Sequence, residues 1–159
     1  MSDWETLTVL RQSHDAGLDK LKLLEDVAEE LRQGRSVETL PRLRQLLRFF
    51  NGELRTHFLH EENGLFPVLA RIIGRMGPIG AMIEEHQSLW RAVETLEEHV
   101  IALERGSAVG LAETEKVATH IVWFLRSHIQ KENDMLFPLA ERHLSQEGRW
   151  EVEHRIKAA

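Results

Sequence analysis

Hydrophobic residues recur along this chain at intervals of three and four positions, which is the period of an amphipathic helix. The pattern is clear in the stretch that contains Leu18, Leu21, Leu24, Val27, Ala28 and Leu31. The sequence contains no alternating apolar run of the kind that forms a half-buried strand. The pattern therefore predicts an all-α protein.

Glycine and proline interrupt the helical pattern at four places. These interruptions are Gly34, the segment 74–80, the segment 106–110 and Gly148. They separate four long helices from a short C-terminal helix over 146–159, and we expect the long helices to form an up-down four-helix bundle. The Asn51-Gly52 pair is normally a turn signal, yet it falls inside the second long helix, where we expect it to produce a kink.

The two halves of the chain repeat one another. Residues 54–67 read LRTHFLHEENGLFP, and residues 125–138 read LRSHIQKENDMLFP. Each copy has a histidine, a glutamate four residues later, and a Leu-Phe-Pro tail. His14 and His86 also correspond, so the repeat extends well beyond this motif.

The length and composition suit a single domain. A chain of 159 residues with 42% hydrophobic content can form one substantial core. We therefore expect one domain over residues 1–159, built from a duplicated helical hairpin. Its halves cover about 1–73 and 78–145, and the tail helix follows.

The repeated motif points to a metal site. Residues four apart lie one turn apart on a helix, so each copy presents an imidazole beside a carboxylate. The four matched histidines are separated by 43, 29 and 42 residues. This long-short-long spacing brings all four to one level of an up-down bundle, where facing helices can build a metal site. The candidate metal ligands are His14, His57, Glu61, His86, His128 and Glu132.

The donor set narrows the choice of metal. Four imidazoles and two carboxylates suit divalent iron or manganese well and zinc tolerably, whereas they suit calcium and magnesium poorly. Two dications would carry four positive charges, and two bridging carboxylates would cancel only half of them. We therefore expect an oxo or hydroxo bridge, or another anionic ligand. Each ion would keep open positions at which a small molecule can bind.

Charge and composition exclude several other classes. The net charge is −6 and no basic stripe is visible, which argues against nucleic acid as a partner. No stretch of the sequence is apolar enough to cross a membrane, and the N-terminus does not resemble a signal peptide, so we expect a cytoplasmic protein. The chain has no cysteine and no tyrosine. Disulfides, thiolate chemistry and phenolate ligands are therefore excluded.

These motifs resemble the hemerythrin-like, or HHE cation-binding, domains. That family has one histidine in the first helix, His-x-x-x-Glu in the second, one histidine in the third and His-x-x-x-Glu in the fourth. The resemblance covers about residues 8–145. It implies two non-haem irons, one bound by His14 and His57 and the other by His86 and His128, with Glu61 and Glu132 as bridges.

The sequence also departs from two groups within this family. Oxygen-carrying hemerythrins have a further histidine one turn after the third-helix histidine. Here that position is Trp90, which cannot bind a metal. Di-iron proteins that repair iron–sulfur clusters carry an additional N-terminal cysteine-containing segment and a further helical histidine, and neither is visible here. The chain therefore resembles a minimal member.

Other side chains near the expected site have more ordinary explanations. His60 corresponds to Lys131 in the second copy, so we expect it at the surface. His120 and Glu53 are outside candidates for contacts with the metal ligands. Four aromatic residues are expected in the bundle core, where they could also restrict access to the metals: Phe50, Trp90, Trp123 and Phe124.

The leading hypothesis is a non-haem di-iron protein that binds or senses oxygen, nitric oxide or peroxide. The alternatives are a di-iron oxidoreductase acting on these molecules, an iron donor in iron–sulfur cluster repair, and a structural bundle that holds zinc. The ligand set is the same for the first three, so the sequence leaves catalysis open. A homodimer is compatible with the sequence but not required, because one duplicated bundle supplies all six ligands.

Overall fold

The structure is a computed structural model that describes residues 4–35, 37–106 and 110–159. Within these ranges all regular elements are helical, and no strand occurs. The α-helices are α1 (Glu5–Arg32), α2 (Leu40–Phe49), α3 (Arg55–His60), α4 (Phe66–Ile73), α5 (Pro78–Glu104), α6 (Leu111–Lys131), α7 (Phe137–His143) and α8 (Gln146–Ala158). Three π-helical turns connect some of them: η1 (Phe50–Leu54), η2 (Glu61–Leu65) and η3 (Glu132–Leu136). The all-α prediction is confirmed.

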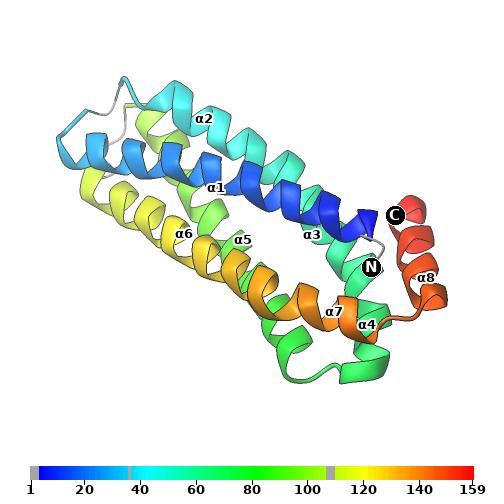
Figure 1. Ribbon diagram of the computed structural model, residues 1–159. Helices are drawn as coiled ribbons and strands as arrows, with labels where there is room; N and C mark the ends of the chain where they lie inside the picture. Colours follow the sequence, from blue (N-terminus) through cyan, green and yellow to red (C-terminus); the bar gives the residue numbers. More distant parts are fainter. Residues whose placement is uncertain (1–3, 36, 107–109) are drawn as a thin grey trace.

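Four long helical rods form the bundle (Figure 1). The first rod is α1 and the third is α5, whereas the second continues from α2 through α4 and the fourth from α6 into α7. The rods α1 and α5 both pack along α6, and α5 also packs along α2. This arrangement is the predicted four-helix bundle. None of its helices, within the ranges described, is both long and apolar enough to cross a membrane.

The helix α8 lies outside the bundle and packs against η2 and α4 (Figure 1). It begins at Gln146 because Ser145 caps it: the Gly148 backbone N–H donates to Ser145 Oγ at 3.1 Å. The expected interruption at Gly148 is therefore wrong, since this glycine lies in the first turn of α8. At the other end of the chain, Trp4 Nε1 donates to Glu153 of α8 at 3.0 Å.

Two of the π-helical turns occupy matching positions in the repeat. The turn η2 begins at Glu61 and η3 begins at Glu132, and each ends at the leucine of a Leu-Phe-Pro sequence. Proline has no N–H, so Pro67 cannot donate to the carbonyl of Asn63, four residues earlier. The helix widens where that hydrogen bond is missing. Each candidate glutamate ligand thus stands at the start of a locally widened helix.

The remaining π-helical turn, η1, contains the Asn51-Gly52 pair. The Asn51 side chain donates from Nδ2 to the carbonyl oxygen of Leu47 at 3.0 Å, and so bonds one turn back along its own helix. The irregularity expected at this pair is therefore a π-helical turn, and the rod continues through it.

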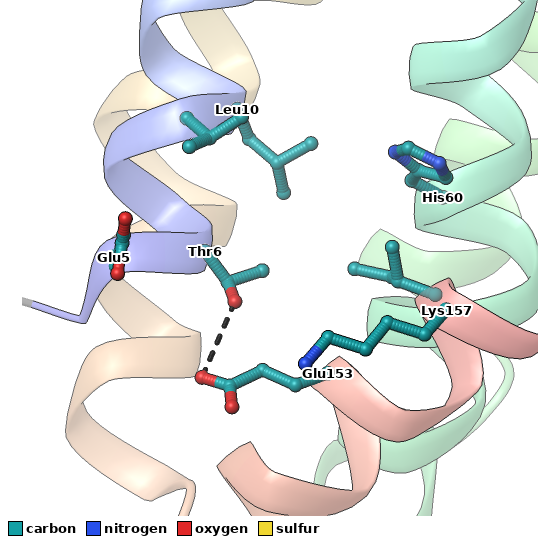
Figure 2. Close-up of a pocket in the computed structure, with 8 residues that line it drawn as sticks. Glu5, Thr6, Leu10, His60, Glu153 and Lys157 are labelled. Atoms are coloured by element: carbon teal, nitrogen blue, oxygen red, sulfur yellow. Dashed lines mark hydrogen bonds between the residues drawn. The ribbon is translucent and has the colours of Figure 1, made fainter.

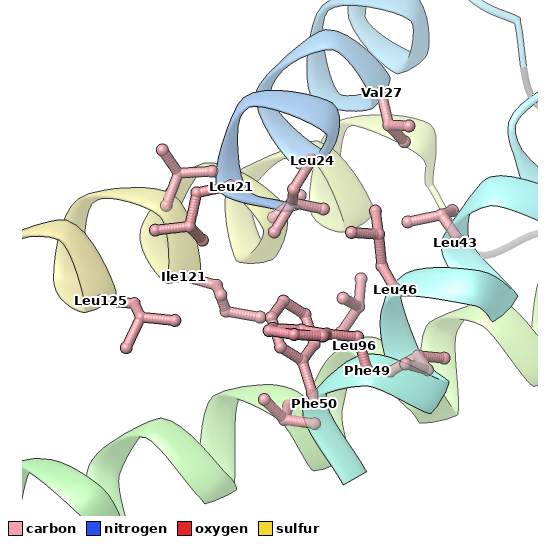
Figure 3. Close-up of a cluster of buried hydrophobic side chains, with 14 of the residues drawn as sticks. Leu21, Leu24, Val27, Leu43, Leu46, Phe49, Phe50, Leu96, Ile121 and Leu125 are labelled. Carbon is pink, nitrogen blue, oxygen red and sulfur yellow. The ribbon is translucent and has the colours of Figure 1, made fainter. Parts of the chain in front are cut away.

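The apolar core has two parts, which lie on either side of the candidate ligands along the bundle. One part gathers around Phe50 between α1, α2, α5 and α6 (Figure 3). The other lies toward the α4–α5 connection and α8, and includes Leu7, Leu65, Phe66, Phe137 and Val152. The polar cluster is thus isolated from water at both ends by packed side chains.

Three of the four aromatic residues expected in the core are there. Phe50 is fully buried, and Trp90 and Phe124 pack against the first part of the core. Trp123 is 75% exposed, so its expected core position is wrong. The buried face of α6 passes through Ile121, Val122 and Leu125, and a residue 200° around the helix from Ile121 points to solvent.

Candidate metal centre

The structure brings all six candidate ligands together inside the bundle. They come from four rods, and each has at most 4% of its surface exposed. Their ligand atoms form two overlapping groups, and within each group all atoms lie within 4.8 Å of one another. The first group is His14, His57, Glu61 and Glu132, and the second is Glu61, His86, His128 and Glu132. The two glutamates belong to both.

Each carboxylate lies between imidazoles from both halves of the chain. Glu61 is 3.2 Å from His57 Nε2 through Oε2 and 3.3 Å from His86 Nε2 through Oε1. Glu132 Oε1 is 2.9 Å from His14 Nε2 and 3.5 Å from His128 Nε2. All four imidazoles therefore turn Nε2 inward, and the carboxylates occupy the positions of bridging groups.

Several inward-facing polar atoms have no hydrogen-bond partner within the described part of the chain. They are His57 Nε2, both carboxylate oxygens of Glu61, and Glu132 Oε2. Leaving a buried polar atom unpaired costs about 1–3 kcal/mol, so a cluster of such atoms needs an explanation. Nitrogen and carboxylate donors converging on one space are what two cations require, and the residues therefore fit a pair of divalent metal ions.

The charges of the metal-free cluster are strongly perturbed. Burial, together with repulsion by Glu132, raises the pKa of Glu61 well above its usual range. Burial alone would raise the pKa of Glu132 as well, but its close contacts with Glu61 and with the histidines hold it well below its usual range. Burial opposes the charged form of His128, yet hydrogen bonds with Glu132 and Glu85 raise its pKa to about 10. Cations entering the cluster would displace the protons that it holds.

The outward ring nitrogens of two ligands make contacts that the sequence analysis missed. His14 Nδ1 lies 2.7 Å from Asn133 Oδ1, and His128 Nδ1 lies 3.1 Å from Glu85 Oε1. Such partners fix the ring orientation and the tautomer of a metal-bound histidine. Their position in the sequence could have indicated these contacts, because Asn133 and Glu85 each stand next to a candidate ligand. His120 and Glu53, the outside candidates for this role, are both exposed.

Aromatic rings hold the imidazoles from the apolar side. Phe58 stacks on His86 with ring centroids 3.6 Å apart and planes 5° from parallel. Phe137 stacks on His14 in the same way, at 5.1 Å and 8°. Trp90, at the position of the further histidine of oxygen carriers, packs edge-on against Phe58. The aromatic residues near the site thus orient its ligands and exclude water.

A cavity of about 670 Å³ lies beside the cluster on one side. Its walls come from α1 and from the η1–α3 segment, and His57 and His60 are among the residues that line it. His60 also lines a second cavity of about 360 Å³ between α1, α3 and α8, drawn in Figure 2. It is half-buried, so the expected surface position is only partly correct.

The protein is a helical bundle whose buried histidines and glutamates surround two overlapping cation positions. It therefore belongs to the class of proteins with a candidate dinuclear metal centre. Residues 5–140 match the family described as the Hemerythrin HHE cation binding domain. The chain belongs to this family, and the resemblance found in the sequence is confirmed.

Two relatives are named for iron–sulfur cluster repair. The chain is 28% identical over 134 residues to the iron-sulfur cluster repair protein DnrN of Neisseria gonorrhoeae, across 81% of this chain and 85% of that protein. It is 32% identical over 102 residues to the iron-sulfur cluster repair protein YtfE of Pectobacterium carotovorum subsp. carotovorum (strain PC1). That match covers 62% of this chain and only 46% of the relative. No solved structure gave a significant match.

Proposed function

We propose that this protein is a non-haem di-iron protein whose iron serves iron–sulfur cluster repair. The observation that carries the proposal is the set of unpaired nitrogen and oxygen atoms that converge inside the bundle. The repair role is supported by the similarity to DnrN, because that match spans most of both chains. The cytoplasmic location expected from the sequence belongs to the same proposal.

The ligand assignment follows the two groups of converging atoms. His14 and His57 would hold one iron, His86 and His128 the other, and Glu61 and Glu132 would bridge them. Manganese or zinc could occupy the same donors. One bundle contains every ligand, so the centre does not need a second chain.

The bound irons would supply open coordination positions and a source of ferrous iron, and the protein supplies their surroundings. The stacked rings of Phe58 and Phe137 hold His86 and His14 in place. The two parts of the apolar core exclude water from the ends of the site. The buried carboxylates would offset half of the charge of two dications, which favours their binding.

A second candidate function is the binding of oxygen, nitric oxide or peroxide at the same centre. The observation that favours it is the cavity with His57 in its wall, because a small molecule that enters this cavity comes next to one of the candidate ligands. Turnover of such a ligand would make the protein an oxidoreductase. Both functions use the same six residues.

Iron transfer tests the proposal. Protein reconstituted anaerobically with ferrous iron is mixed with a cluster protein whose cluster has lost iron, and recovery of the cluster is followed by its absorption. We expect recovery with the wild type and a large loss with Glu132→Ala. His120→Ala, which removes an exposed histidine from the same rod, is the matched control. Iron that stays on the protein while the damaged cluster remains unrepaired would contradict the repair role.

Adding nitric oxide to the same iron-loaded sample tests the second function. A spectral change in the wild type that Glu132→Ala lacks would support ligand binding at the centre. An unchanged wild-type spectrum would exclude nitric oxide as a ligand of the centre.

A further inference from the structure

The two halves of the candidate centre have different outer contacts, although the sequence repeat makes them counterparts. Behind His128, Glu85 Oε1 lies 3.1 Å from Nδ1, and Lys131 Nζ donates to Glu85 Oε2 at 2.8 Å. The counterpart of Glu85 in the first half is Ser13. Correspondingly, His57 Nδ1 is buried without a hydrogen-bond partner in the ranges that the structure describes.

His86 and His14, the other pair of counterparts, also differ in the charge of the group near the outward nitrogen. Glu62 Oε2 lies 3.6 Å from His86 Nδ1, which is ion-pair range, so His86 Nδ1 has a charged neighbour but, like His57 Nδ1, no hydrogen-bond partner in the described ranges. The counterpart of Glu62 is Asn133, and its neutral amide oxygen lies 2.7 Å from His14 Nδ1. Both histidines of one metal position therefore have a carboxylate near the outward nitrogen, one hydrogen-bonded and one at ion-pair distance, whereas those of the other have an amide and no charged group there.

Carboxylates behind metal-bound imidazoles strengthen binding. They accept the outward N–H, make the ligand nitrogen more basic and add negative charge near the cation, and loss of such a partner typically weakens metal affinity 10- to 100-fold. At the His86/His128 position Glu85 is such a group, although Lys131 offsets part of its charge, and Glu62 adds a second negative charge at ion-pair distance. The His14/His57 position has none, so its metal is held less tightly.

The two metal positions also differ in how close they lie to the cavity between α1 and α3. His57 is one of the residues that line the 670 Å³ cavity, whereas His86 and His128 are not, and a Cβ added at Gly52 in its wall would meet nothing within 4 Å. The more weakly held position is thus the one that the cavity adjoins.

We propose that the two metal positions are not equivalent: the His14/His57 position fills last, empties first and exchanges through the cavity between α1 and α3, while the His86/His128 position keeps its ion. This inference rests on the proposed function, because it assumes two metals in the cluster. It identifies which iron a repair protein would give up. Glu85 and Glu62 are then positioning residues that set the order of release.

The order of filling can be observed directly by nuclear magnetic resonance. Metal-free protein labelled with ¹⁵N in its histidines is titrated with Zn²⁺ alone, and the ring nitrogens, assigned through single His→Gln variants, report which imidazoles bind. At one equivalent we expect His86 and His128 to shift while His14 and His57 remain unchanged. At two equivalents all four should shift. Simultaneous shifts of all four, or the opposite order, would overturn the inference.

A variant that exchanges the two outer residues tests the cause. Ser13→Glu/Glu85→Ser removes the carboxylate from His128 and introduces one at the counterpart position, in the cavity wall that also contains His57, and we expect the affinity gap to shrink at least tenfold or to reverse. Glu84→Ser removes an exposed carboxylate beside Glu85 and is the matched control, with an unchanged order. Circular dichroism of the metal-free proteins verifies folding, and Ser13→Glu alone provides a second test because it removes no contact.

An unchanged order in the exchanged variant would overturn the role of the carboxylates. Failure of all four histidines to respond to two equivalents of zinc would instead contradict the proposed function itself. The two failures are therefore distinguishable.

Discussion

Replacing Gly64 with alanine should loosen the attachment of α8 to the bundle. A Cβ at this position would lie 2.6 Å from Ile156 Cγ1 and 3.3 Å from its Cδ1. Ordinary carbon–carbon contacts are about 3.5–4.0 Å, so the overlap with Cγ1 is about 1 Å. The β-branched isoleucine has little freedom at χ1. The helix itself must therefore move.

Two opposing effects determine how much Gly64→Ala changes the free energy of unfolding. Overpacking of this kind costs about 1–3 kcal/mol, whereas replacing a helical glycine with alanine gains about 1 kcal/mol. Gly52→Ala has the stabilising effect without the overpacking cost, because a Cβ at Gly52 would meet nothing within 4 Å. The free energies of unfolding of Gly64→Ala and Gly52→Ala should therefore differ by about 1–3 kcal/mol. For a chain of this size that corresponds to about 2–12 °C in Tm.

The assay is thermal unfolding of the metal-free proteins, followed by circular dichroism. In the Ile156→Ala background the overlapping atoms are gone, so Gly64→Ala should there become stabilising, as Gly52→Ala is in the wild type. If Gly64→Ala raised the Tm of the wild-type protein as much as Gly52→Ala does, α8 could not pack against η2 as described.

Three further predictions concern the site and the surface. Phe58→Leu should disturb the stacked His86 ring and weaken metal binding measurably in a titration with ferrous iron; an unchanged affinity would exclude an orienting role for the ring. The folded pKa of His128, about 10, exceeds its ordinary value of 6.5. The stability that this shift contributes is present below pH 6.5 and is lost as the pH rises toward 10, so the Tm of the metal-free protein should fall over that range, and a constant Tm would contradict the shift. Trp123→Ala should change the free energy of unfolding by less than about 0.5 kcal/mol, because the side chain is 75% exposed; a loss above 2 kcal/mol in a denaturant titration would show that this tryptophan is packed.

The spacing of repeated motifs was sufficient to predict which six side chains meet. A helix rises by a constant amount per residue, so the spacing of His14, His57, His86 and His128 specified one level in the bundle. The expected burial of Trp123 was wrong because it rested on the apolar character of the side chain. The angular position of Trp123 on α6 places the side chain in solvent. The burial of a helical residue is therefore predicted better by its angular position relative to buried neighbours than by its residue type.

The outer contacts of the ligands were not predicted from the sequence. Glu85 and Glu62 sit beside candidate ligands, but adjacent helical residues point about 100° apart, and their contact with an imidazole depends on packing between rods. The π-helical turns were missed for a related reason. The repeated Leu-Phe-Pro tail indicates packing, but it does not show that the missing N–H of Pro67 widens the helix that carries Glu61.

The central claim is that six buried side chains hold two metal ions, and iron content tests it most directly. Protein from iron-supplemented cells is subjected to elemental analysis together with visible spectroscopy. We expect about two irons per chain and an oxo-bridge absorption that disappears on reduction and returns in air. One zinc ion or no metal, with a featureless spectrum, would contradict the claim and leave the repeated motif as packing.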